Sequence, residues 1–178
     1  MPGGSDTDQP EPTAGALLVA TPAIGDGIFA RCVALLLQHD EEGTLGVVLT
    51  GPRGEAAAPV LGPASGRAAP PAVVFTGGPV QPEVLVVVGV DPDGRTGWVS
   101  PAVGGPLPAG SLRVFSGYAG WAPGQLASEI AAGGWWVLAA QPGDLLSAGP
   151  DGLWRALVRR LPAPLAFAAT LPIDATHN

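Results

Sequence analysis

The sequence predicts a single α+β domain with a mixed or antiparallel sheet flanked by helices. A chain of 178 residues, 47% of them hydrophobic, is long enough to bury one core. Short apolar segments rich in β-branched and aromatic residues are joined by turns too short for parallel crossovers, and two segments have helical patterns. We expect the domain to cover residues 14–173, between a disordered N-terminal tail at 1–13 and a C-terminal tail at 174–178.

The first part of the chain predicts a strand followed by a hairpin. The apolar run 15–20 ends at a Thr-Pro pair, where a strand stops because proline cannot donate to a sheet. The run 28–38 fits either a helix or a strand, and a short helical turn at 28–30 followed by a strand from about Cys32 accommodates both signals. A polar turn then leads into a strand at 45–49.

The middle of the chain predicts one long loop followed by three strands. Residues 51–71 are mostly Ala, Pro and Gly with scattered Arg, a composition that indicates a loop with at most a weak helix. The strands predicted from β-branched and aromatic residues between turn sequences are 73–75, 84–90 and 112–115.

The strongest helix prediction covers residues 123–132, with a proline at its first position and two glycines just beyond its end. With Ala122 as the N-cap, Trp121 and Leu126 occupy the positions of a hydrophobic staple. Gln125 then stands at the third helical position, from which its side chain can reach back to the N-cap. A strand is predicted at 135–140.

A second helix is predicted at 150–161, because apolar residues recur on one face of it. Asp151 near its start and Arg159-Arg160 near its end suit the helix dipole, and Pro162 ends it. The residues of the apolar face are Leu153, Trp154, Leu157, Val158 and Leu161.

The charged residues exclude several kinds of chemistry. All 8 basic residues are arginine, so neither the lysine of a phosphate-binding P-loop nor a Schiff-base lysine exists. A net charge of −7 disfavours direct binding to DNA, whose affinity comes from basic groups. No apolar run reaches the length of a membrane helix, and no secretory signal is evident, so we expect a cytoplasmic protein without membrane contact.

Metal and thiol chemistry have little support. Cys32, His39 and His177 are too few for a four-ligand zinc site, and we expect no metal and no cofactor. Cys32 stands among apolar residues, which favours an inert core thiol over a nucleophile. His39 precedes three acidic residues that could form a general base or a loose divalent-metal site, but a solvated turn is the favoured interpretation.

Residues 117–126, Gly-Tyr-Ala-Gly-Trp-Ala-Pro-Gly-Gln-Leu, place two aromatic residues between glycines just before a predicted helix. This signature segment strongly resembles the GYAGW-x-x-GQL signature of the YqgE/AlgH-like family of bacterial proteins. The other matching blocks are Leu17-Leu18-Val19-Ala20-Thr21-Pro22, Phe29-Ala30-Arg31, Leu45-Gly46-Val47-Val48-Leu49, Gly77-Gly78-Pro79-Val80 and Trp154. The resemblance implies a partly barrel-like sheet flanked by helices.

The signature segment is the leading candidate for a ligand site. Glycines let a ligand approach the backbone, and a helix N-terminus favours anions. The alternative is a purely structural role, in which the same glycines form a tight corner and Trp121 packs against the helix as a hydrophobic staple. The candidate ligand-binding residues are Gly117, Tyr118, Gly120, Trp121, Gly124 and Gln125, with Gly77, Gly78 and Pro79 as a possible opposite lip or a plain turn.

Two functions remain open from the sequence. The first is a non-enzymatic binding or regulatory protein, because catalytic side chains are few and the family name implies transcriptional regulation. With the acidic charge, we expect it to act through a protein or small-molecule partner. The alternative is an enzyme on a small anionic or nucleotide-like substrate, with Glu129 or Asp26 as acid or base. We assign no catalytic residue.

Overall fold

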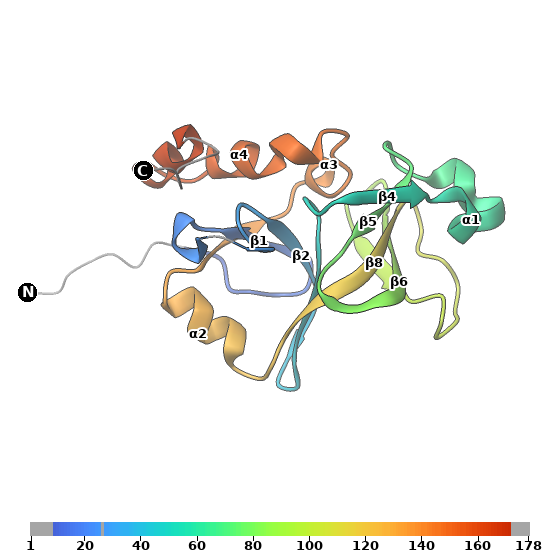
Figure 1. Cartoon of the computed structure of the whole chain (residues 1–178), viewed down its shortest axis with the longest axis horizontal. Helices are drawn as coiled ribbons and strands as arrows, with labels where there is room; N and C mark the ends of the chain where they lie inside the picture. The colour runs from blue at the N-terminus through green and yellow to red at the C-terminus, as the bar shows by residue number, and fades with distance from the viewer. Residues whose placement is uncertain (1–8, 26, 172–178) are drawn as a thin grey trace, which may run out of the picture.

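The computed structural model describes residues 9–25 and 27–171, which form an α+β fold around one open nine-stranded sheet (Figure 1). The strands are β1 (Ala16–Ala20), β2 (Val33–Asp40), β3 (Gly43–Val48), β4 (Arg53–Ala56), β5 (Val73–Thr76), β6 (Val80–Val90), β7 (Thr96–Val99), β8 (Ser111–Trp121) and β9 (Trp135–Ala139). The α-helices are α1 (Ala58–Leu61), α2 (Gln125–Ala131), α3 (Pro142–Leu145) and α4 (Leu153–Val158). Short 3₁₀ helices cover Pro22–Ile24, Gly62–Arg67, Pro150–Gly152 and Leu165–Thr170.

Strand β8 connects the two halves of the sheet, of which one contains β1, β2, β3 and β9 and the other contains β4, β5, β6 and β7. The strand order β4-β5-β8-β3-β2-β1-β9 leaves β4 and β9 at the ends, and β6 pairs with both β7 and β8. All pairs are antiparallel except β5 with β8. The predicted α+β class with a mixed sheet is therefore confirmed, and the sheet does not close into a barrel. No helix among the described residues is long and apolar enough to cross a membrane.

Helices cover both faces of the half that contains β1. In Figure 1, α3 and α4 lie on one side of β1 and β2, and α2 lies on the other. Alternate residues of β1 accordingly enter different clusters: Leu17 and Val19 pack with α4, whereas Leu18 and Ala20 pack on the side of α2. This explains why β1 is one continuous apolar run.

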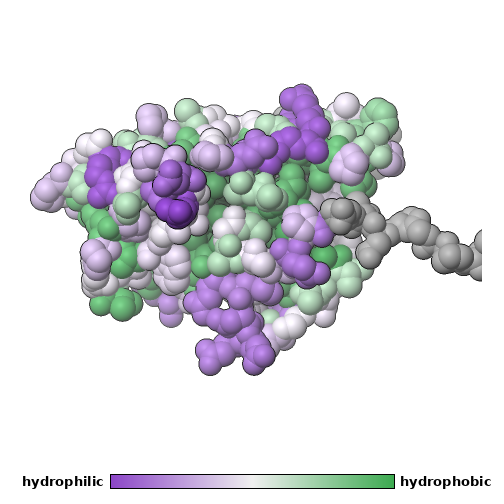
Figure 2. Space-filling model, turned by 180° about the vertical axis from the view of Figure 1, so that it is seen from behind, coloured by the Kyte–Doolittle hydropathy of each residue, from purple (hydrophilic) through white to green (hydrophobic). Residues whose placement is uncertain are grey.

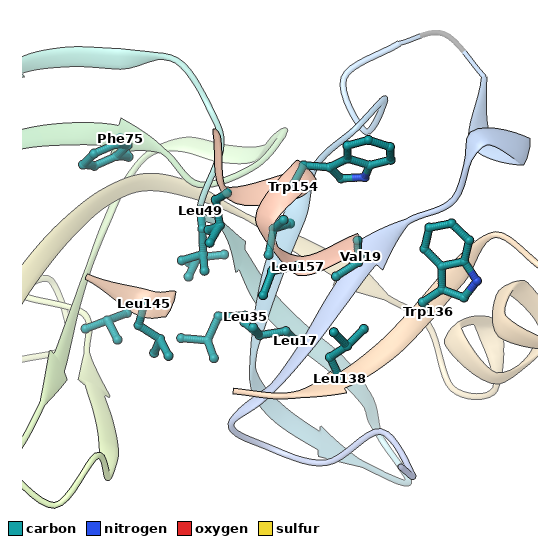
Figure 3. Packing of buried hydrophobic residues seen from close by; sticks show 14 of the residues in the cluster. Leu17, Val19, Leu35, Leu49, Phe75, Trp136, Leu138, Leu145, Trp154 and Leu157 are labelled. Carbon is teal, nitrogen blue, oxygen red and sulfur yellow. The ribbon is translucent and has the colours of Figure 1, made fainter. Parts of the chain in front are cut away.

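Helix α4 anchors the larger core cluster. All five residues of its predicted apolar face are buried, which confirms the helical pattern, although the segment begins as a 3₁₀ turn and the α-helix ends at Val158. Figure 3 shows Leu157 gathered with Val19 and Leu35 of the strands below it. The Trp154 indole N–H donates to the Ala20 carbonyl at 2.8 Å, which ties the helix to the end of β1.

The prediction for residues 51–71 is wrong, because they form β4, α1 and a 3₁₀ helix rather than a loop. Strand β4 is exposed throughout and pairs with β5 through its backbone, so no apolar alternation marks it. Ala57 and Leu61 are buried and hold α1 against β6 and β8. Strand β7 and helix α3 were not predicted either.

The β2–β3 hairpin forms as predicted, with a shorter turn, and its tip is hydrophilic. It corresponds to the hydrophilic projection at the lower edge of Figure 2. His39 Nδ1 lies 2.6 Å from Thr44 Oγ1, and hydrogen bonds, first from Gln38, lower the pKa of Asp40. At the other end of β2, burial raises the pKa of Cys32 to about 12, so the thiol is inert as expected.

The predicted C-terminal tail and the first part of the N-terminal tail lie outside the described residues. Within the predicted N-terminal tail, Gln9 is described, and its side-chain oxygen accepts a hydrogen bond from the Val137 amide at 3.0 Å. This contact lies on strand β9.

Candidate functional site

The first half of the signature segment is the end of a strand rather than a tight corner. Residues 117–121 continue β8, where Tyr118 pairs with Val80 of β6 and Trp121 pairs with Thr44 of β3. The glycines hid this strand from sequence analysis because they lower the β-propensity of the segment. The strand places Ala119 and Trp121 in the cluster beneath α2, while Gly120 faces outward.

Helix α2 begins at Gln125, with Gly124 rather than Ala122 as its N-cap. Gly124 has a φ of 76°, a left-handed conformation that suits glycine. The predicted reach of Gln125 is confirmed, since its side-chain oxygen accepts a hydrogen bond from the Ala122 amide at 2.9 Å. Because α2 has only seven residues and the Ala122 amide is already bonded, its N-terminus offers little to an anion.

Glu129 connects α2 to the sheet by hydrogen bonds to two tryptophans. Its Oε2 accepts from the Trp121 indole N–H at 3.0 Å and from the Trp135 indole N–H at 2.8 Å. Its Oε1 accepts a hydrogen bond from the side-chain Nε2 of Gln125 at 2.9 Å. Trp121 ends β8 and Trp135 begins β9, so one carboxylate fixes three elements relative to one another.

Glu129 is held in its anionic form. Partial burial acts to raise the pKa of Glu129, but hydrogen bonds from Trp135, Gln125 and Trp121 outweigh it and leave the pKa below its usual value. Such a carboxylate has no proton to donate at neutral pH. Its geometry suits it to orienting the two indole rings and to presenting a negative charge beside them.

A cleft of about 370 Å³ opens beside this carboxylate. We call it the signature cleft. Its lining residues come from the turn before β2, the end of β8, α2 and the start of β9: Ala23, Ile24, Phe29, Gly120, Trp121, Gln125, Glu129, Ala132, Gly134 and Trp135. The volume falls within the range of small-molecule sites.

The aromatic wall of the signature cleft is a chain of edge-to-face contacts. The ring centroids of Trp121 and Trp135 lie 6.0 Å apart at an interplanar angle of 78°. Those of Phe29 and Trp135 lie 5.9 Å apart at 73°. These arrangements are the favoured ones for aromatic pairs, so the contacts stabilise the wall in this geometry.

Two further clefts flank the same region. One of about 500 Å³ lies under the hairpin tip and includes Asp40, Glu42 and Tyr118, and it shares Gly120 and Trp121 with the signature cleft. The other, of about 300 Å³, is mostly apolar. It lies between exposed Ile28, Phe29 and the Gly78-Pro79 turn.

The predicted site residues are therefore divided among neighbouring clefts. Gly120, Trp121 and Gln125 line the signature cleft, and Tyr118 lines the cleft under the hairpin. Gly78 and Pro79 line the apolar cleft, on the other side of Phe29. The predicted residues that line none of these three clefts are Gly77, Gly117 and Gly124.

The glycines of the region fall into two classes. A Cβ on Gly77 would lie 2.4 Å from the Gly117 carbonyl oxygen, and one on Gly78 would lie 2.2 Å from the Tyr118 carbonyl group. Gly117, with a φ of 68°, is similarly confined by Gly78. At Gly120, in contrast, the nearest atoms to an added Cβ are 3.9 and 4.0 Å away. Packing alone therefore does not require glycine at position 120.

Phe29 and Trp135 also line the site, although neither was predicted as a site residue. Phe29 stands 106 positions before Trp135, and the pairing of β1 with both β2 and β9 brings their segments together. Trp135 appeared as an ordinary strand residue. Only the three-way contact with Glu129 distinguishes it, and that contact is tertiary.

Replacing Glu129 by alanine should lower stability. The two indole N–H groups and the Gln125 amide lose their acceptor, and we expect a loss of about 2 kcal/mol, discounted because the carboxylate is partly solvated. In a domain of this size, such a loss corresponds to a decrease in melting temperature of about 4–8 °C. Glu129→Gln keeps an acceptor for the indoles and should lose less than half as much. Equal losses in both variants would contradict this role.

The stabilisation from Glu129 should depend on pH. Because its folded pKa is lowered from an ordinary value of 4.5, the contribution is fully present above that value and is lost as the pH falls toward the folded pKa. The melting-temperature difference between wild type and Glu129→Gln should shrink between about pH 6 and about pH 3. A constant difference over that interval would show that the carboxylate charge is not involved.

Comparison with known proteins covers nearly the whole domain. The sequence profile described as AlgH-like matches residues 17–166. A UPF0301 protein of Streptomyces coelicolor is 44% identical over 182 aligned residues, which cover 92% of this chain and 94% of the relative. A UPF0301 protein of Streptomyces avermitilis is 45% identical with the same coverage.

Solved structures have the same fold. A crystal structure of a Corynebacterium diphtheriae protein aligns with a TM-score of 0.76 and 34% identity, covering 92% of this chain and 95% of that one. The solution structure of the AlgH protein from Pseudomonas aeruginosa aligns with a TM-score of 0.64 and 28% identity, covering 93% and 98%. The similarity therefore includes the signature segment and every element that lines the signature cleft.

Proposed function

Because this chain belongs to the AlgH-like family, and its family signature forms one wall of a cleft, we propose that it is a binding protein for a small-molecule partner. The signature cleft would hold the ligand, and its occupancy would be the regulatory signal. The protein would act without catalysis, in the cytoplasm, the compartment expected from its sequence. Direct contact with DNA is not part of this proposal.

The observation that carries the proposal is the open space at Gly120. Its exposed backbone lines the signature cleft and the cleft under the hairpin, and nothing in the packing excludes a Cβ there. Glycine inside a strand destabilises it relative to alanine by about 0.5–1 kcal/mol. A costly glycine that the fold does not need is explained if its missing side chain keeps the cleft open to a ligand.

The catalytic alternative has weaker support. Glu129, the acid or base that it requires, is committed to three hydrogen bonds that keep its pKa low. The second candidate, Asp26, lies outside the described residues. The helix start that was to bind an anionic substrate belongs to a short helix whose neighbouring amide is already bonded.

The proposal is tested by filling the cleft at Gly120. A thermal-shift screen of metabolites on wild type should find at least one compound that raises the melting temperature, because a ligand of the folded state stabilises it. Gly120→Leu should abolish that shift while the unliganded variant stays folded. Gly66→Leu is the matched control, since an added Cβ at Gly66 meets nothing within 4 Å and Gly66 lies away from the cleft.

Two results would overturn the proposal. One is a screen in which no compound stabilises wild type. The other is a ligand whose stabilising effect survives unchanged in Gly120→Leu, which would place its site elsewhere.

A further inference from the structure

We infer that the ligand of the signature cleft carries an aliphatic cation, a primary ammonium or guanidinium group, seated against Glu129 and the aromatic wall. This inference rests on the proposed function and specifies its ligand class. It follows from the charge of the cleft, the nature of its wall and the bonding of its one carboxylate.

The ionisable side chain in the signature cleft is a carboxylate without a cationic partner. Among the described lining residues, Glu129 is the only acidic one and none is basic. The ion pairs that join two described residues are Arg53–Asp151, Arg95–Asp93 and Arg160–Asp144, and none of these three involves Glu129. Among the described residues, the side chains that donate to Glu129 are all neutral.

The bonding of Glu129 leaves room for one more donor. Oε2 accepts both indole N–H groups, whereas Oε1 accepts only the Gln125 amide. A carboxylate oxygen can accept two hydrogen bonds, so Oε1 retains capacity for a donor from the ligand. A charged N–H donor forms a stronger hydrogen bond with a carboxylate than a neutral donor does.

The walls of the cleft favour the same class of ligand. Trp121, Trp135 and Phe29 offer π-systems, which attract ammonium and guanidinium groups and also pack against an alkyl chain. An anionic group would meet the Glu129 carboxylate with no arginine among the described lining residues to compensate it. This reverses the expectation from sequence, in which the helix N-terminus suggested an anionic ligand.

The test uses the indole N–H signals of the five tryptophans in a ¹H–¹⁵N correlation spectrum, assigned by single Trp→Phe variants. The probes are butylammonium and butylguanidinium chloride, with 1-pentanol as the neutral analogue and pentanoate as the anionic one, at equal ionic strength. We expect both cations to shift the Trp121 and Trp135 signals saturably. The signals of Trp98 and Trp154 should stay in place.

Affinity should be at least about tenfold weaker for pentanol and undetectable for pentanoate. Glu129→Gln should weaken binding of the cations by about tenfold or more, because an acceptor for the indoles remains while the negative charge and the acceptor at the Oε1 position are lost. Gly120→Leu, which leaves Glu129 unchanged, should block them as well and provides a second variant if the first unfolds.

Failure of the ligand class and failure of the proposed function give different results. Pentanoate binding as tightly as butylammonium, cations that cause no shift, or full affinity in folded Glu129→Gln would each overturn the inference. The proposed function would stand if another compound still shifted Trp121 and Trp135 and was blocked by Gly120→Leu. It would fail with the inference if no compound did so.

Discussion

Gly78→Ala should abolish the native fold or lower its stability by more than about 4 kcal/mol. A methyl group at Gly78 would lie 2.2 Å from the Tyr118 carbonyl carbon and oxygen and 2.5 Å from the Ala119 amide nitrogen. Those atoms belong to β8, which pairs with β3, β5 and β6, so the strand cannot move without breaking several pairings. Urea denaturation followed by far-UV circular dichroism measures the loss.

Gly120→Ala is the matched control for this prediction. The same methyl group added two residues beyond Tyr118 meets no atom closer than 3.9 Å, so stability should change by less than about 1 kcal/mol. A Gly78→Ala protein with the melting temperature of wild type would contradict the close packing of the two signature blocks. Equal damage from both substitutions would contradict the assignment of Gly120 to the open cleft.

Arg113→Met should lower stability by about 3 kcal/mol, equivalent to about 6–12 °C in melting temperature. Arg113 is 3% exposed and donates to the carbonyls of Pro70, Leu145 and Ser147 at 2.7, 3.2 and 3.2 Å. Its guanidinium also lies 4.8 Å from the Phe75 ring centroid. Methionine fills much of the space but leaves three carbonyls without a donor.

A buried cation also carries a desolvation cost, which the substitution removes. Burial lowers the pKa of Arg113 to about 10, so the group remains charged at neutral pH and the cost is real. We expect the lost hydrogen bonds to outweigh it, because they attach the segment around α3 to β8. Arg113→Lys should be intermediate, since a lysine offers a point charge rather than a planar fork. An Arg113→Met protein as stable as wild type would contradict the role of these bonds.

The elements with a clear side-chain pattern were predictable from sequence. The run 15–20, the apolar face from Leu153 to Leu161 and the hairpin of β2 with β3 each bury a recognisable set of residues. Strands β4 and β7 were not predictable, because they are largely exposed and are held by backbone pairing. Glycines likewise concealed the extension of β8 through the signature segment.

The candidate site was only partly predictable for a related reason. Trp121 and Gln125 could be assigned local roles, and the reach of Gln125 to the Ala122 amide was anticipated from spacing alone. The convergence of Phe29, Glu129 and Trp135 on Trp121 depends on long-range packing. The contrast between Gly120 and the confined glycines around it also appears only when the space beside each is known.

The most direct test of the central claim is an indole N–H spectrum of wild-type protein mixed with the small-molecule fraction of a bacterial extract. A ligand in the signature cleft should move the Trp121 and Trp135 signals together, because both indoles donate to Glu129. Trp154, which donates to the Ala20 carbonyl, should not move, and Gly120→Leu should show no change. Unmoved Trp121 and Trp135 signals at saturating extract, or equal shifts in Gly120→Leu, would contradict the claim that this cleft binds a ligand.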